Sequence, residues 1–99
     1  MCSKTMLFPA KIRQLREEKE LYQKQLADAL SIDRPMYCRI EKGERCAKKE
    51  QIPIIAELLQ ADPEELLALW LADKVTAVVE DEHKVGDKAL DIAKQNFKS

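Results

Sequence analysis

Apolar residues recur at helical spacing along most of the chain, which predicts an all-α fold. In residues 10–19, Ile12 and Leu15 lie three residues apart between charged neighbours. This stretch predicts an amphipathic helix that opens after Pro9 and turns its charged side chains to water. Leu21 is expected in the core, in the link to the next helix.

The following stretch predicts two short helices joined by a tight turn. Three apolar residues share one face of the first, residues 23–30: Leu26, Ala27 and Leu30. The second, residues 34–42, follows Asp33, a good N-cap, carries Pro35 in its first turn and stops at Gly43. Two helices this short bury little apolar surface by themselves. They make sense as a helix-turn-helix, in which the first braces the second and the second offers one face to a DNA groove.

Beyond a basic loop over residues 44–49, residues 51–60 predict a fourth helix of about nine residues with a proline in its first turn. Asp62 and Pro63 then form a strong start signal for a fifth helix that continues to about Glu80. The acidic run at residues 80–82 together with Gly86 predicts a bend. A sixth helix is expected over residues 87–97.

These elements predict a five-helix domain over residues 9–71 and a C-terminal helical extension over residues 72–99. The net charge of −1 hides an asymmetry between the two halves of the chain. Residues 1–50 hold 12 Lys/Arg against 8 Asp/Glu, a net of +4, and residues 51–99 hold 5 against 10, a net of −5. A basic half joined to an acidic half fits a polyanion-binding face with a second part pointing away from it.

The composition argues against several other classes of protein. No apolar run approaches the roughly 18 residues that span a bilayer, and the N-terminus has no signal-peptide pattern, so a cytoplasmic protein without a membrane partner is expected. The three cysteines and one histidine lack metal-ligand spacing, and the odd cysteine count predicts free thiols. Without a phosphate-binding loop or metal ligands, neither an enzyme nor a cofactor is expected.

Residues 11–71 resemble the Cro/repressor-type helix-turn-helix family, the XRE family, which includes phage repressors and bacterial regulators. The resemblance is carried by five blocks in order: KIRQLREEKE, QKQLA, RIEKGER, IAELL and DPEELL. It implies that residues 34–42 form the recognition helix. It also implies a five-helix Cro/repressor-like domain.

Within such a recognition helix, four residues share the face that approaches the bases: Arg34, Pro35, Cys38 and Arg39. The arginines are the predicted base readers, because a guanidinium matches the O6/N7 edge of guanine. Contact with phosphate alone, or pairing with Asp33, is the alternative for either arginine. Cys38 is read as an adaptable contact, with an oxidisable thiol as its alternative. Three residues of the opposite side are expected in the core: Met36, Tyr37 and Ile40.

Five further residues form a predicted set of DNA backbone contacts: Gln23, Lys24, Arg45, Lys48 and Lys49. An ordinary solvated surface is the alternative for each lysine. The family resemblance implies an ion pair between Arg16 and Glu41 that is structural. Ser31 and Glu20 stand where the family favours glycine, so a residue with a side chain is expected at positive φ in the turn.

The fifth helix is apolar nearly all round, more than a small core requires. Either the sixth helix folds back over it, or it meets a second chain across a two-fold axis. The second reading is preferred because one small module buries little DNA surface. The predicted dimer interface comprises Leu66, Leu69, Trp70 and Val78.

Together these features predict a homodimeric, sequence-specific double-stranded DNA-binding transcriptional regulator of a bacterium or phage. It would bind a near-palindromic operator. Repression by occlusion of a promoter and activation through RNA polymerase or another protein partner are both compatible with this reading. The alternatives are a protein-interaction adaptor that keeps the fold without operator binding, and an antitoxin or restriction-modification controller.

Overall fold

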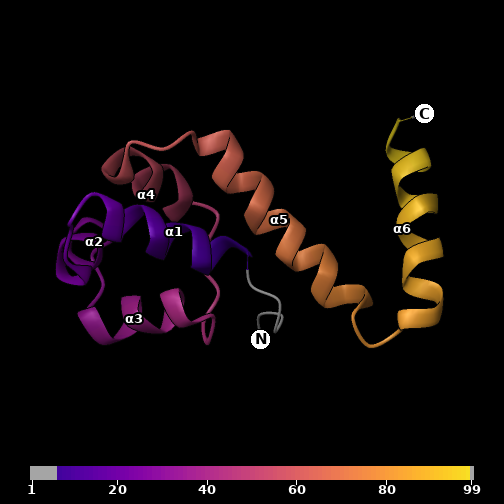
Figure 1. Cartoon of the computed structure of the whole chain (residues 1–99), viewed down its shortest axis with the longest axis horizontal. Coiled ribbons are helices and arrows are strands. Elements are labelled where there is room, and N and C mark those ends of the chain that lie inside the picture. The colour runs from indigo at the N-terminus through magenta and orange to yellow at the C-terminus, as the bar shows by residue number, and fades with distance from the viewer. Residues whose placement is uncertain (1–6, 99) are drawn as a thin grey trace.

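The computed structural model describes residues 7–98, and this range contains six helices and no strand. The helices are α1 (Leu7–Glu18), α2 (Gln23–Ala29), α3 (Arg34–Lys42), α4 (Gln51–Leu59), α5 (Pro63–Val79) and α6 (His83–Lys98). Figure 1 shows α1–α4 gathered at one end, α5 running diagonally away from them, and α6 at the other end. The predicted all-α fold is confirmed.

The core lies between α1, α2, α3, α4 and the first half of α5. Helix α2 packs across α3, while α1 packs against α3, α4 and α5. The largest fully buried side chains are Ile12, Leu26, Tyr37, Ile52, Ile55, Leu59 and Leu66. Each comes from the apolar side of its helix, so amphipathic spacing accounts for this packing.

Local signals set the ends of the central helices as predicted. The Asp33 carboxylate accepts a hydrogen bond from the Met36 N–H at 2.8 Å, and the Asp62 carboxylate accepts one from the Glu64 N–H at 3.0 Å. Gly43 ends α3 with φ 78°. The expected positive φ is present at Ser31 (58°), and it recurs at Glu20 and Gln60.

Helix α1 begins before the predicted residue 10, because α5 supplies its N-terminal cap. The buried carboxylate of Asp73 accepts hydrogen bonds from the N–H groups of Leu7 and Phe8, both at 2.9 Å. Unpaired N–H groups at a helix start need such acceptors. The packed part of the chain therefore reaches Asp73, and the expected division at residues 71 and 72 falls inside the continuous helix α5.

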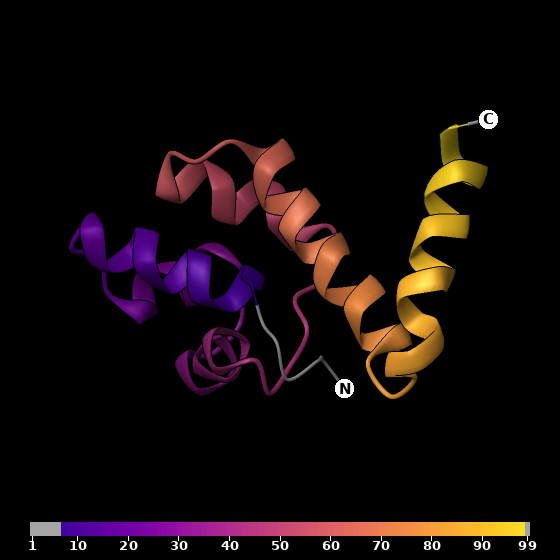
Figure 2. The same ribbon diagram turned by 45° about the vertical axis from the view of Figure 1, so that its right-hand side comes forward.

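The predicted bend forms at the acidic run, but the inclusion of Gly86 in it is wrong, because α6 already begins at His83. The chain turns at residues 80–82, and Gly86 lies in the first turns of α6. A Cβ at this position would stand 3.2 Å from both the Cβ and the carbonyl oxygen of Val79, so the glycine allows α6 to approach the end of α5 closely. Beyond this contact the two helices diverge, as Figures 1 and 2 both show. Helix α6 does not fold back over the core.

The apolar residues in the first half of α5 are used within the chain. Leu66 is 1% exposed and belongs to the core, and Leu69 and Trp70 pack against that core. The prediction that Leu66 lies at a dimer interface is therefore wrong, since a side chain already buried cannot meet a second chain. Val78, by contrast, is 80% exposed. None of the described helices combines the length and apolar character needed to cross a membrane.

Candidate nucleic-acid interface

Helix α3 exposes one side along its whole length. Arg34, Pro35 and Arg39 are exposed and Cys38 is half-buried, while Tyr37 and Ile40 face the core. Met36, expected in the core, is half-buried. Figure 1 shows α3 along an edge of the helical domain, at the end of the molecule away from α6. The four predicted base-contact residues thus share a side of α3 that solvent reaches.

Lys42 extends this exposed side by one turn and was not among the predicted contacts. Lys42 lies four residues after Cys38 and three after Arg39, and these two lie three and four residues after Pro35, which keeps all four on one face of the helix. The same spacing argument that selected the first four residues could have found Lys42, had it been carried to the last residue of the helix.

Both ends of α3 are closed by hydrogen bonds that leave the exposed side clear. The Asp33 carboxylate is engaged at the first turn. At the last turn the carbonyl oxygen of Arg39 accepts from the N–H groups of Glu44 and Arg45, at 2.9 and 3.3 Å. These are ordinary cap interactions that satisfy terminal backbone groups.

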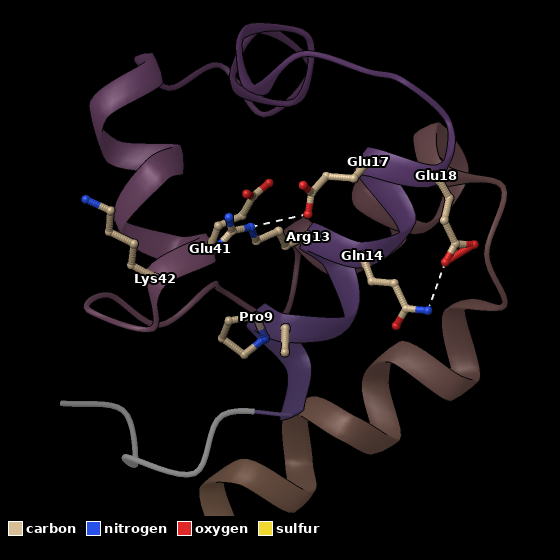
Figure 3. A pocket seen from close by; sticks show the side chains of 8 residues that line it. Pro9, Arg13, Gln14, Glu17, Glu18, Glu41 and Lys42 are labelled. Atoms are coloured by element: carbon tan, nitrogen blue, oxygen red, sulfur yellow. Dashed lines mark hydrogen bonds and ion pairs between the residues drawn. The ribbon is translucent and has the colours of Figure 1, made fainter.

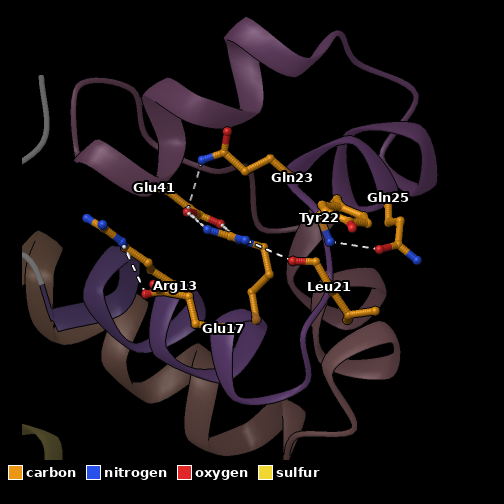
Figure 4. A network of polar contacts seen from close by, with 8 residues as sticks. Arg13, Glu17, Leu21, Tyr22, Gln23, Gln25 and Glu41 are labelled. Atoms are coloured by element: carbon orange, nitrogen blue, oxygen red, sulfur yellow. Dashed lines mark hydrogen bonds and ion pairs between the residues drawn. The ribbon is translucent and has the colours of Figure 1, made fainter.

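A buried ion pair fixes α3 relative to α1. The guanidinium of Arg16 donates two hydrogen bonds to the Glu41 carboxylate, from Nε to Oε2 at 2.7 Å and from Nη2 to Oε1 at 3.1 Å (Figure 4). Its third nitrogen donates to the Leu21 carbonyl oxygen at 2.8 Å. The Glu41 side chain is only 2% exposed. The structure thus brings together the two residues that the family resemblance paired.

Gln23 completes this network from the start of α2. Its side-chain amide donates to Glu41 Oε1 at 3.2 Å (Figure 4). The half-buried side chain of Gln23, a predicted DNA backbone contact, is therefore turned towards the Glu41 carboxylate. One carboxylate on α3 thus holds α1 and the start of α2 together.

The network shifts the ionisation of its members. Burial opposes the charge on Glu41, but hydrogen bonds led by that of Arg16 outweigh it and lower the pKa of Glu41. The hydrogen bond to Glu41 raises the pKa of Arg16 in turn. Burial raises the pKa of the Tyr37 hydroxyl, and the neighbouring Glu41 carboxylate adds to the rise. Glu41 and Arg16 are therefore charged, and Tyr37 neutral, near neutral pH.

The basic loop after α3 is held by its backbone. The Trp70 indole N–H donates to the carbonyl oxygen of buried Ala47 at 2.9 Å, and the Lys48 N–H donates to Gln51 Oε1 at 2.9 Å. The side chains of Arg45, Lys48 and Lys49 remain exposed, as does Lys24 on α2. A loop fixed at its main chain presents its cations from defined positions, which suits contact with phosphates.

Trp70 has a role within the chain that sequence reasoning missed. Besides its hydrogen bond to Ala47, its ring lies 4.4 Å from the Lys74 ammonium, measured to the ring centroid. The half-buried indole therefore joins α5 to the loop that follows α3. The prediction of Trp70 as a dimer contact did not anticipate this use of its polar edge.

A hollow between α1 and α3 offers no convergent site for a small ligand (Figure 3). Its polar side chains pair along α1 at helical spacing: Arg13 forms an ion pair with Glu17 at 3.3 Å, and the Gln14 amide donates a hydrogen bond to Glu18 at 2.8 Å. Lys42 is also part of its lining. Among residues 7–98, no three His, Cys, Asp or Glu side chains gather as a metal site would require.

The cysteines differ from the expectation in one case. Cys38 is a free, half-buried thiol on α3, as predicted. Cys46, in the basic loop, is disulfide-bonded, so the prediction of free thiols is wrong there.

Comparison with known proteins agrees with this geometry. A family model described as a helix-turn-helix domain matches residues 8–69, which span α1 to α4 and the first turns of α5. No curated protein and no solved structure matches the chain. The matched range contains the braced pair α2 and α3, and the chain belongs to the helix-turn-helix domain family.

Proposed function

We propose that this chain is a sequence-specific, double-stranded DNA-binding transcriptional regulator of the XRE type, with α3 as its recognition helix. The observation that carries the proposal is the exposed side of α3, which bears Arg34 and Arg39 while the other side of the helix packs into the core. A protein with this activity acts in the cytoplasm, where bacterial DNA lies.

The exposed side of α3 suits direct readout in the major groove. Arg34 in the first turn and Arg39 one turn later present guanidinium groups that can bind guanine in a bidentate manner. Pro35 and Cys38 supply apolar contact between them. Lys42, at the end of the helix, is placed to reach a phosphate instead of a base.

The second group of cations would set the position of α3 on the duplex. Lys24, Arg45, Lys48 and Lys49 are exposed around the helix pair, and the loop that bears three of them is anchored by Trp70 and Gln51. Contacts of this kind add affinity without reading sequence, and they weaken as salt rises.

A homodimer on a near-palindromic operator would supply the rest of the affinity. A single module of this size buries roughly 600–1,000 Å² of protein surface on DNA, which is at the low end for specific binding. Two copies would place their recognition helices in successive major grooves, about 34 Å apart.

Selection of bound duplexes from a random pool, at two stated salt concentrations, tests the proposal. The expected result is a symmetric consensus and an affinity that falls steeply with salt. Complete absence of binding at low salt would instead support a protein-interaction adaptor that retains the fold.

A pair of variants tests which residues read bases. Arg34→Ala should relax preference at one position of each half-site, by roughly 1–3 kcal/mol. Lys48→Ala should weaken binding to all sequences alike and reduce the salt slope by about 1. Measured affinities for the consensus and for single-base variants of it separate these outcomes. Uniform weakening by both substitutions would show that Arg34 does not read a base.

A further inference from the structure

Helix α6 is amphipathic, and almost nothing covers its apolar side. One half of the helix carries the apolar residues together with Gly86, interrupted only by Asn96, and the other half carries the lysines and aspartates. Of its residues, Gly86 alone is buried within the described chain. Ile92 is 59% exposed and Phe97 is 90% exposed.

Exposed apolar residues also occur on the second half of α5, the helix that leads into α6. Large exposed hydrophobic side chains occur on both helices: Leu71, Val75 and Val78 on α5, and Val85, Leu90, Ile92 and Phe97 on α6. Where the two helices meet, Thr76, Val79, Gly86 and Leu90 line one part of a hollow, and Glu80, Asp81, His83 and Asp87 line its polar rim. We call this combined surface the α5–α6 face.

We propose that the α5–α6 face is the dimerisation surface, and that its occupant is the same face of a second copy with the two α6 helices antiparallel. The inference deepens the proposed function by naming the surface that makes the dimer. Dimerisation itself requires no DNA and can be measured apart from DNA binding.

The exposed area fits a dimer. The exposed fractions of these seven side chains amount to roughly four fully exposed ones, or about 400–500 Å² of apolar surface per copy at roughly 100 Å² each. Interfaces are only about 60% apolar, so the whole contact would bury roughly 800 Å² per copy. This matches a standard specific interface of about 1,600 Å² in total.

The charges favour a second copy in the antiparallel orientation. Helix α6 follows an acidic turn that contains Asp81 and Glu82, and it ends with Lys94 and Lys98. Antiparallel pairing brings the acidic end of each copy beside the basic end of the other, twice in one contact. A partner surface with charges of only one sign would be attracted to one end of α6 and repelled by the other.

The position of the face leaves α3 available. Helix α6 lies at the opposite end of the molecule from α2 and α3 (Figures 1 and 2). The pairing therefore covers none of the exposed side of α3, and two copies can bind DNA while joined.

The test uses the full chain without DNA, in sedimentation equilibrium over a range of concentrations. The wild type should have twice the monomer mass of 11.4 kDa. Ile92→Glu should raise the dissociation constant of the dimer by roughly 100-fold or more, since two buried isoleucines are lost in each dimer. Gln95→Glu adds the same charge on the polar side of α6, and it should leave the dimer intact.

A monomeric wild type would overturn the inference, and so would an Ile92→Glu variant that dimerises like Gln95→Glu. Circular dichroism of both variants should match that of the wild type, because Ile92 packs on no core residue and glutamate favours helix. Binding of the Ile92→Glu monomer to a single half-site reports on the proposed function separately. A wild-type dimer that binds no DNA would leave the dimerisation surface standing and reject the regulator.

Discussion

Replacement of Arg16 by methionine tests the packing of α3 most directly. The substitution keeps much of the aliphatic stem, but it removes both hydrogen bonds to a carboxylate whose side chain is 2% exposed. Glu41 then keeps the weaker contact from Gln23 at 3.2 Å. A buried charge without its partner costs roughly 3–5 kcal/mol.

This loss is large on the scale of the whole fold. Domains of this size have a total free energy of unfolding of about 5–15 kcal/mol. The Tm of Arg16→Met should fall by roughly 15 °C or more relative to the wild type. Urea and thermal unfolding at pH 7, followed by circular dichroism, measure both quantities.

The pH dependence gives a second and more specific signature. In the wild type the pKa of Glu41 is lowered, so its contribution to stability is present above its ordinary value of 4.5 and is lost as the pH falls below that value. Without Arg16 the largest cause that lowers the pKa of Glu41 is lost while burial remains, so this pKa should lie above its position in the wild type. Protonation of Glu41 then removes the buried charge of the variant as the pH falls, which relieves part of its loss of stability.

The gap in unfolding free energy between Arg16→Met and the wild type should therefore narrow as the pH falls from 7 towards 5. The double variant Arg16→Met/Glu41→Leu is the control, because it leaves no buried charge and should recover much of the lost stability. A loss below about 1 kcal/mol at pH 7, or a gap that stays constant with pH, would refute the reasoning that Glu41 is buried and charged.

Two further substitutions examine contacts between distant parts of the chain. Trp70→Phe keeps the aromatic packing but loses the hydrogen bond to Ala47, so it should lower the free energy of unfolding by about 1 kcal/mol and weaken DNA binding at all sequences alike. A gel-shift series on consensus and mismatched duplexes measures the binding, and an altered base preference would contradict the prediction. Asp73→Ala removes the cap of α1 and should lower the free energy of unfolding, measured with urea, by roughly 2 kcal/mol or more. An unchanged unfolding midpoint would show that the N–H groups of Leu7 and Phe8 find other acceptors.

The helices of the central motif were predictable because their signals are local. Asp33 and Asp62 bond N–H groups no more than three residues away, and Gly43 needs only its own backbone freedom. The exposed side of α3 likewise follows from three- and four-residue spacing. The bounds of α3 agree with the prediction for this reason.

Family resemblance supplied one contact that local patterns could not. Arg16 and Glu41 are 25 residues apart, and no spacing rule joins residues of two different helices. The five blocks of the family resemblance placed both positions in a known arrangement. The structure adds that Arg16 contacts the Glu41 carboxylate through two hydrogen bonds and that Gln23 donates a further one to the same carboxylate.

The order of apolar and polar residues in the sequence determined that the chain is all-α, where most helices lie and which side of each is apolar, since these depend on neighbours within about one turn. Only the tertiary structure decided what each apolar or polar side meets. It placed Leu66 in the core, assigned Asp73 to the start of a helix 65 residues earlier and left the apolar side of α6 uncovered. Contacts of this kind depend on how distant segments pack, and periodicity along the chain contains no information about which segments meet.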